Sequence, residues 1–303
     1  MPCCTDAAIR CAALGVAAAL SGCTAFQRVA PAKPAVQAPG PLPVLANATT
    51  LAIPSAPAAA ATPEIKPVGY PSADDEPKRL LRDAETAYAR QPSYIARMKR
   101  REISPTGKLK PEEVIMVRFR EKPWSVHFKW LGDEGKGREI VYVNGQHENK
   151  LHVLTAAGDI PLMPGGRRMS FALDSPLVKA ASRYPIGEAG IGQSIARYGH
   201  LVELAAKPGS GAAVKVLGRM PRPEYPVPLD ALECTIPPNV APEVPQGGKR
   251  LYFFDPTTKF PVLTVTTDLA GIQVDYCCFD RFQLDVKLDD ADFDPDKLWP
   301  VKK

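Results

Sequence analysis

The histidines are the first side chains to examine for chemistry, because imidazole is a common metal ligand and proton carrier. His147 and His152 lie five residues apart, which matches neither one face of a helix nor one face of a strand. The other two histidines, His127 and His200, have no neighbouring ligand pattern. The sequence also lacks the zinc, nucleophile-elbow and phosphate-loop motifs. We therefore predict no metal site, no cofactor and no catalytic residue.

The cysteines are the second candidates. Beyond residue 23 the chain has only Cys234, Cys277 and Cys278. Strand alternation predicts that Cys278 points inward together with Tyr276, and that Cys277 points outward. A disulfide from Cys234 requires a Cα separation below about 7 Å, whereas a simple meander places two strands between the partners. We expect Cys278 to be a buried free thiol.

The amino-terminal residues carry a motif for covalent modification. An apolar stretch ends in Leu20-Ser-Gly-Cys23, and it is too short to span a bilayer, which needs about 20 residues. Leu-Ser-Gly-Cys resembles the bacterial lipobox, in which the signal is cut before the cysteine and its thiol carries diacylglycerol. The alternative is an ordinary cleaved signal. The resemblance predicts a signal peptide at 1–23, lipidation of Cys23 and, with Thr24 next, an outer-membrane anchor facing the periplasm.

A change of composition follows the cysteine. Many of the 33 prolines lie within residues 24–73, together with alanines. Such a segment cannot build a core, and as polyproline II at about 3.1 Å per residue it could extend to on the order of 140 Å. We predict a disordered tether at 24–73 and a folded domain at 74–303. The net charge of +5 gives no reason to expect a nucleic-acid partner.

The segment 124–130 has a large apolar face. Trp124, Val126, Phe128 and Trp130 occupy every second position, with Ser125, His127 and Lys129 between them. In a strand these positions point to opposite sides, which gives one aromatic face and one solvated face. The aromatic face is either packed core or the wall of a groove for an apolar ligand. Both readings place the same side chains inside.

The remaining elements alternate in the same way. Helical spacing of apolar residues predicts helices at 74–90 and 187–206. Alternation and turn residues predict strands at 94–102, 113–120, 124–131, 138–144, 150–155, 231–236, 250–254, 262–267 and 272–288. The last run is far longer than an ordinary strand, so it must coil. The predicted fold class is α+β: a curved antiparallel sheet of about nine strands, an incomplete barrel, covered by two helices.

Charged residues accompany the first strands. Cross-strand ion pairs on a solvated face are one interpretation, and a polar rim that contacts a lipid headgroup or a partner protein is the other. These charged residues are Arg118, Arg120, Glu121, Lys122, Arg138 and Glu139. The basic run 97–101 has the same two interpretations.

Several longer motifs resemble a known family. The segments Val-Arg-Phe-Arg-Glu-Lys-Pro-Trp, Lys-Gly-Arg-Glu-Ile-Val-Tyr-Val-Asn-Gly and Leu-Asp-Asp-Ala-Asp-Phe-Asp are similar, in the same order, to bacterial lipoproteins grouped as domain of unknown function 1571. The order helix, meander, helix, meander resembles more distantly the periplasmic lipoprotein-carrier (Lol-type) fold. That resemblance implies a half-open barrel with a hollow for acyl chains and no enzymatic chemistry.

The sequence therefore predicts an anchored lipoprotein that binds lipid or lipoprotein acyl chains in a groove. The alternative is a structural or regulatory envelope protein acting through protein contacts. Across these two hypotheses, the partners of the protein would be the membrane, through Cys23, and a lipid, a lipoprotein or an envelope protein. The predicted groove residues are Trp124, Val126, Phe128, Trp130, Tyr142, Ile191, Ile195 and Tyr276.

Overall fold

The computed structural model describes residues 75–104, 107–160 and 162–300. The predicted signal peptide, Cys23 and the predicted tether lie outside these residues. Within them, no helix has the length and apolar character needed to cross a membrane.

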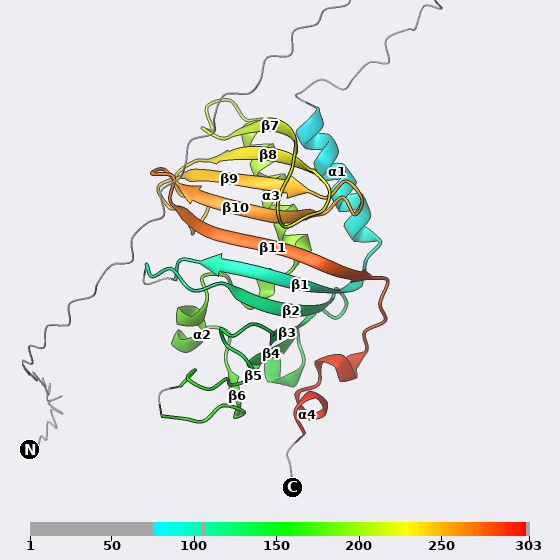
Figure 1. The fold of residues 1–303 in the computed structure, drawn as a ribbon, viewed down its shortest axis with the longest axis vertical. Helices are drawn as coiled ribbons and strands as arrows, with labels where there is room; N and C mark the ends of the chain where they lie inside the picture. Colours follow the sequence, from blue (N-terminus) through cyan, green and yellow to red (C-terminus); the bar gives the residue numbers. More distant parts are fainter. Residues whose placement is uncertain (1–74, 105–106, 161, 301–303) are drawn as a thin grey trace, which may run out of the picture. The chain divides into compact units, whose positions relative to one another are not determined.

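The described chain is built on one sheet of eleven strands (Figure 1). All neighbouring strands are antiparallel, in the order β6-β5-β4-β3-β2-β1-β11-β10-β9-β8-β7. The edges, β6 and β7, do not pair, so the sheet is not closed. The strands are β1 Ser93–Glu102, β2 Glu113–Arg120, β3 Ser125–Trp130, β4 Glu139–Val143, β5 Leu151–Leu154, β6 Arg168–Phe171, β7 Ala213–Met220, β8 Leu229–Ile236, β9 Gly248–Phe254, β10 Pro261–Asp268 and β11 Gln273–Leu284.

Two meanders make up this sheet. Strands β1 to β6 form the first and β7 to β11 the second, and β1 pairs with β11 to join them. The curved antiparallel α+β class is as predicted, but the count of nine strands is wrong. The strands missed are β6, which is four residues long, and β7, whose alternation is interrupted by a register shift at Gly218, φ 77°.

The last strand is shorter than the alternation predicted. It ends at Leu284 after twelve residues, and Arg281 and Asp285 have positive φ values of 53° and 56°. Left-handed residues interrupt the strand conformation. Beyond Arg281 the alternation continues with its two faces exchanged, because Phe282 stacks on Phe279 instead of pointing away from it.

Helices cover one side of the sheet, which we call the inner face. The predicted helices are present as α1, Glu76–Ala89, and α3, Ile191–Ala205, and α3 lies behind the sheet in Figure 1. They pack closely, since a side chain at Gly192 would lie 2.6 Å from the Tyr88 ring. Two further short helices were not predicted, α2, Pro176–Ala181, and α4, Pro295–Leu298. Three 3₁₀ turns complete the list: η1, His147–Asn149; η2, Ile186–Glu188; and η3, Asp290–Phe293.

The opposite, outer face is covered in two places. Residues 221–228, the proline-rich connection of β7 to β8, cross β11, where Tyr225 donates to the carbonyl of Phe279. The carboxy-terminal residues pack Phe293 and Trp299 against Val141 and Val143. The predicted solvated face of residues 124–130 is therefore wrong for Ser125 and His127, which are 0% and 1% exposed, and only Lys129 of this face is exposed.

Candidate functional site

A partly open cavity of about 630 Å³ lies on the inner face. Its floor is formed by strands β1 to β6 and β9 to β11. Its roof is formed by residues 177–190, which we call the lid, and by the first turns of α3. The volume is within the range of about 300–1,000 Å³ that is usual for small-molecule sites. The protein is therefore hollow where the lid and the polar residues Gln193, Ser194 and Arg197 of α3 cover the sheet.

One end of the cavity floor is apolar. Phe128, Ile140, Val153 and Met169 are register partners in sequence across β3, β4, β5 and β6, so their side chains form one row. Leu151 and Phe171 form a second pair of register partners beside it. From the lid, Leu177 and Val178 face the same space. This combination can accept hydrocarbon.

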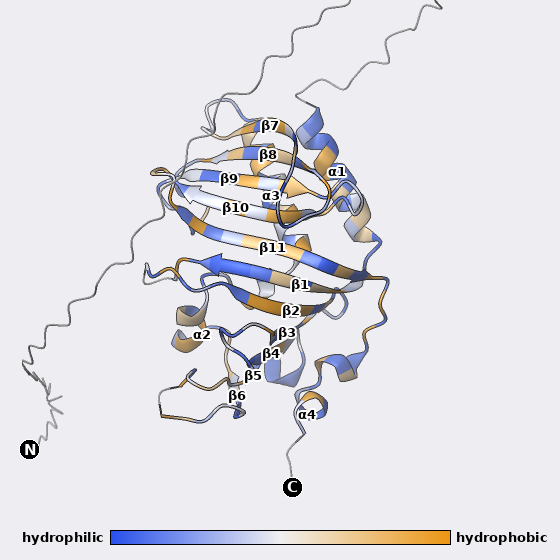
Figure 2. Ribbon diagram, viewed as in Figure 1, coloured by the Kyte–Doolittle hydropathy of each residue, from blue (hydrophilic) through white to orange (hydrophobic). Residues whose placement is uncertain are grey.

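The other end of the floor is charged. Along β1, Met98, Arg100 and Glu102 all line the cavity, so the wall changes from apolar to ionic along one strand. Figure 2 shows the same change, with the arrowhead of β1 coloured hydrophilic. Glu102 pairs across the strands with Asp275, which also lines the cavity. The cavity is amphipathic along the strand direction.

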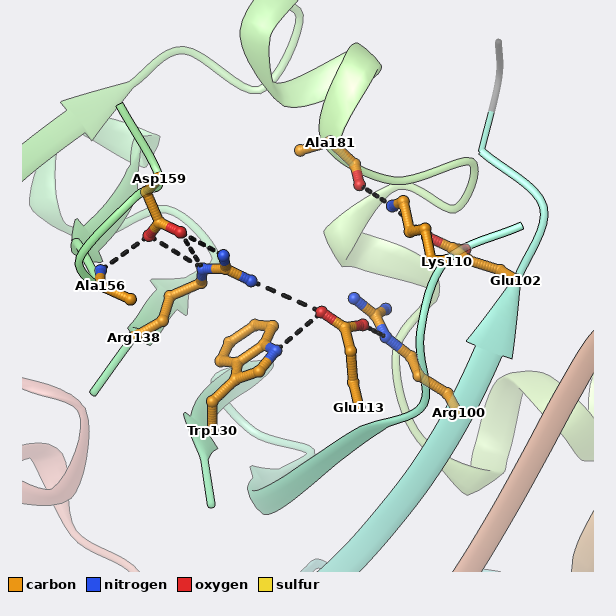
Figure 3. Close-up of polar contacts among 9 residues, drawn as sticks. All are labelled: Arg100, Glu102, Lys110, Glu113, Trp130, Arg138, Ala156, Asp159 and Ala181. Carbon is orange, nitrogen blue, oxygen red and sulfur yellow. Dashed lines mark hydrogen bonds and ion pairs between the residues drawn. The ribbon is translucent and has the colours of Figure 1, made fainter. Parts of the chain in front are cut away.

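A network of ion pairs organises the charged wall (Figure 3). Glu113 accepts hydrogen bonds from Arg100 Nε at 2.6 Å and Trp130 Nε1 at 2.8 Å. Arg138 reaches Glu113 at 3.5 Å and forms a fork with Asp159. Burial alone would raise the pKa of Glu113, but Arg100 and the Trp130 N–H hold it below its ordinary value. These carboxylates are therefore ionised at neutral pH.

The lid is attached to the sheet by cations. Lys110 Nζ lies 2.7 Å from Glu102 and also donates to the carbonyl of Ala181. Arg183 donates to the carbonyls of Ser104 and Glu243, each at 3.1 Å. These polar contacts, together with partly buried Val178, Ile186 and Ala189, hold the lid above the cavity, whereas α3 is held by fully buried apolar residues.

The predicted groove residues divide into three groups. Phe128 and Trp130 line the cavity. Tyr276 lies on the outer face, where its hydroxyl donates to Glu224 at 3.0 Å. The other five do not line the cavity and belong to the packed core: Trp124, Val126, Tyr142, Ile191 and Ile195. In this core the Trp124 ring contacts the rings of Phe119 and Tyr142.

The orientation predicted for the vicinal cysteines is reversed. Cys277 lines the cavity and Cys278 lies on the outer face, because Cys277 is the register partner of cavity-lining Arg100. The residues 221–228 cover the outer face, which explains why an apolar run there is not an interior wall. Cys234, Cys277 and Cys278 are free thiols, and Cys278 is fully buried, as predicted.

The charged residues noted in the sequence have separate roles. Arg138 lines the cavity, whereas Arg118 contacts buried His127 at 3.3 Å on the outer face. Arg120 pairs with Asp290 at 2.9 Å in the carboxy-terminal segment. Glu139 accepts from His127 and Trp299, at 2.8 and 3.0 Å. Ion pairing is thus present, but much of it lies beneath covering segments.

Sequence reasoning missed the acidic and basic floor of the cavity. The signal was present in the strand 94–102, where Arg100 and Glu102 have the same parity as inward-facing Tyr94 and Met98. Charge at inward positions indicates a polar cavity or a paired network. Among the described residues, no group of three or more His, Cys, Asp and Glu side chains is arranged to hold a metal ion.

A family model described as Protein of unknown function (DUF1571) matches residues 91–298. The chain belongs to this family. The match includes all of the residues that line the cavity, and it confirms the resemblance seen in the motifs. A comparison with curated protein sequences found no match.

Comparison with solved structures found similar folds at low identity. The Mycobacterium tuberculosis lipoprotein LppX is 13% identical, with a TM-score of 0.42, covering 71% of this chain and 100% of that one. The MucA/MucB complex structure of Pseudomonas aeruginosa gives 13% identity and a TM-score of 0.40, covering 72% and 60%. A LolA superfamily protein from Nitrosomonas europaea gives 12% identity and a TM-score of 0.31, covering 72% and 97%.

Proposed function

We propose that this domain binds an amphiphile non-covalently, with an acyl chain in the cavity and its polar group at the charged end. The proposal includes lipoprotein acyl chains as well as free lipids. It describes a carrier or receptor and needs no bond-breaking step. The roles predicted for Cys23, as the lipidated anchor in the outer membrane, and for 24–73, as a tether, are part of the same proposal.

The observation that carries the proposal is the apolar row of Phe128, Ile140, Val153 and Met169 beneath an unfilled space. Each methylene moved from water to such a surface gains about 0.8 kcal/mol. An acyl chain of several methylenes is therefore held without any covalent contact. The lid, with its few polar anchors, is the element that must move for entry and release.

Native mass spectrometry tests this function. The full chain carrying Cys23→Ser, which removes the predicted acylation site, is purified without detergent from cells. We expect adducts with the masses of one or more lipids, and we expect them to disappear in the Phe128→Glu variant. Ile195→Glu is the contrasting variant, because Ile195 lies in the packed core and its substitution should unfold the chain.

Two outcomes would contradict the carrier proposal. One is repeated absence of lipid in the folded Cys23→Ser chain together with failure to bind any added acyl compound. The other is unchanged lipid content in a folded Phe128→Glu chain. Either result would favour the structural or regulatory alternative, in which the domain engages an envelope protein.

The predicted anchor is tested separately. Metabolic labelling with palmitate should modify the wild-type chain and not the Cys23→Ser chain. The variant should leave the membrane fraction and appear in the soluble periplasmic fraction. Labelling of both chains would contradict the role of Cys23 and would leave the cavity proposal unaffected.

A further inference from the structure

The charged end of the cavity contains buried polar atoms that have no hydrogen-bond partner among the described residues, on Glu102, Tyr184 and Arg250. Arg100, Lys110, Arg138, Arg197 and Arg250 are the cations that line it, and each has a carboxylate partner. Asp275 lines the same space, and its side chain makes no hydrogen bond or ion pair with any described residue. The charge of Arg250 acts on this carboxylate without pairing with it. Each cation of the wall is therefore in an ion pair with another carboxylate, and Asp275 is a carboxylate without an ion pair.

Glu102 adds a second acceptor directly beside Asp275. The two residues are register partners on β1 and β11, and both line the cavity. Side chains directly opposite on antiparallel strands have Cβ atoms about 4.5–5.5 Å apart, and like charges there repel. Glu102 is 3% exposed, and only its Oε1 is bonded, to Lys110; Oε2 is buried without a hydrogen-bond partner in the described chain.

The lid contributes a third unsatisfied group. Tyr184 lines the cavity and its buried hydroxyl has no hydrogen-bond partner among the described residues. Burial raises the pKa of Tyr184, and the charges acting on it include those of Asp275, Arg250 and Glu102. The hydroxyl is therefore neutral and lies in the same electrostatic environment as the two carboxylates. Leaving buried polar groups unpaired destabilises the chain, and a ligand that pairs with them removes this cost.

We propose that the Asp275 and Glu102 carboxylates, with the Tyr184 hydroxyl, bind a protonated amine in the polar group of the amphiphile. This inference rests on the proposed function and specifies its ligand class. An ammonium group offers three donors and a positive charge, and it matches two adjacent carboxylates and one hydroxyl. An anionic group would be repelled by Asp275 and Glu102, and the cations of this wall already form ion pairs with other carboxylates.

Three probes that share a twelve-carbon chain test the ligand class. Dodecylamine, dodecanol and dodecanoate are each titrated at pH 8 against Nile red bound to the full-length Cys23→Ser protein, and displacement of the dye gives the affinity of each probe. Charge-assisted hydrogen bonds contribute about 1.5–3 kcal/mol, so we expect dodecylamine to bind about tenfold or more tighter than dodecanol. Dodecanoate should bind no tighter than dodecanol.

Variants locate the preference. Asp275→Asn keeps the shape of the side chain and should reduce the ratio of amine to alcohol affinity to within about threefold. Glu102→Gln is a second, independent variant and should reduce the ratio in the same direction. Glu112→Gln is the matched control, because Glu112 is exposed beside Arg101 and does not line the cavity, and it should leave the ratio unchanged.

The outcomes separate the two proposals. If all three probes displace Nile red from the protein with equal affinity, the amine inference is wrong and acyl binding stands. If dodecanoate binds tightest, the charged end is an anion site and the inference is also wrong. If no probe and no dye binds, the proposed function itself fails. A ratio that is unchanged in folded Asp275→Asn and Glu102→Gln would overturn the assignment to these residues.

Discussion

The inner face of the sheet has a filled region and a hollow region that share the same strands. Under α3, Phe119, Val126 and Ile191 are at most 1% exposed and leave no room for a ligand. Two residues farther along β3, Phe128 lines the cavity. The strands alternate in the same way in both regions. The two regions differ in what covers the sheet, which is the buried apolar residues of α3 over the filled region and the lid with polar residues of α3 over the hollow region.

The covers differ in how they are held. Helix α3 begins against the sheet, where the N–H of Ile191 donates to the Tyr94 hydroxyl at 3.0 Å. Gly190 has φ 94°, and a side chain there would lie 2.8 Å from the same hydroxyl, so only glycine permits this approach. The lid is packed less completely: Val178, Ile186 and Ala189 are only partly buried against the core, Leu177 is 67% exposed, and α2 has no buried residue. A ligand site therefore lies beneath the less firmly held cover.

The largest expected effect is in the filled region. Phe119→Ala should lower the free energy of unfolding by about 3–5 kcal/mol, because it removes a fully buried ring and leaves a cavity. Urea unfolding followed by tryptophan fluorescence measures this. A loss below about 1 kcal/mol would show that this region is loosely packed. The filled and hollow regions would then not differ in packing.

The next effect concerns the charge beneath the lid. Burial raises the pKa of Asp275 from 3.8 to about 6; Arg250 opposes this rise and Glu102 adds to it, while Arg197 and Arg100 also oppose it. Because the folded-state pKa exceeds the unfolded value, the penalty is present above pH 6 and disappears as the pH falls towards 4. Asp275→Asn should therefore stabilise the chain by up to about 3 kcal/mol at pH 8, and much less at pH 4.

This prediction is measured as the difference between variant and wild type at each pH. The difference is needed because other carboxyls change stability in the opposite direction. In Glu139, burial alone would raise the pKa, but His127 and Trp299 lower it to about 2, so its contribution is lost as the pH falls below its ordinary value. A stabilisation that is equal at pH 8 and pH 4 would contradict the ionised state of Asp275.

A smaller effect on stability is expected at the hollow end. Phe171 is partly exposed and lines the cavity, so Phe171→Ala should change the free energy of unfolding by less than about 1 kcal/mol. The same substitution removes apolar wall from the ligand and should weaken binding of a dodecyl probe about fivefold. Phe119→Ala is the matching variant in the filled region, and we expect it to lower the free energy of unfolding without a specific change in affinity for the dodecyl probe. Equal destabilisation by the two variants would mean that both regions are core.

The smallest effect is a change in labelling rate. Cys277 lines the cavity, whereas Cys278 is fully buried on the outer face. Burial raises the pKa of both thiols, and that of Cys277 more than that of Cys278, so labelling with a methanethiosulfonate reagent should be slow for each. Cys277 should still be labelled faster, because a reagent in the cavity can reach it, whereas Cys278 is 0% exposed. A bound dodecyl probe should slow labelling of Cys277 further. Preferential labelling of Cys278 in the folded chain would contradict the assignment of the two faces.

The sequence by itself determined the local structure and much of the class. Alternation placed β1 to β5 and β8 to β10 within two residues of their ends, and the spacing of Ile191, Ile195 and Tyr198 gave the buried face of α3. These patterns are local, because the pleat and the helical turn fix which side chains share a face. The same patterns and motifs led to the family assignment.

Only the tertiary structure decided which face of the last strand is interior and whether the interior is full. Tyr276 and Cys278 have the alternation of an interior wall, yet the wall that they form is covered by residues 221–228 on the outer face. Phe119 and Phe128 are chemically alike, yet only Phe128 meets the cavity. The physical reason is that burial depends on which distant segment covers a face, and that choice is made by packing between elements far apart in the chain.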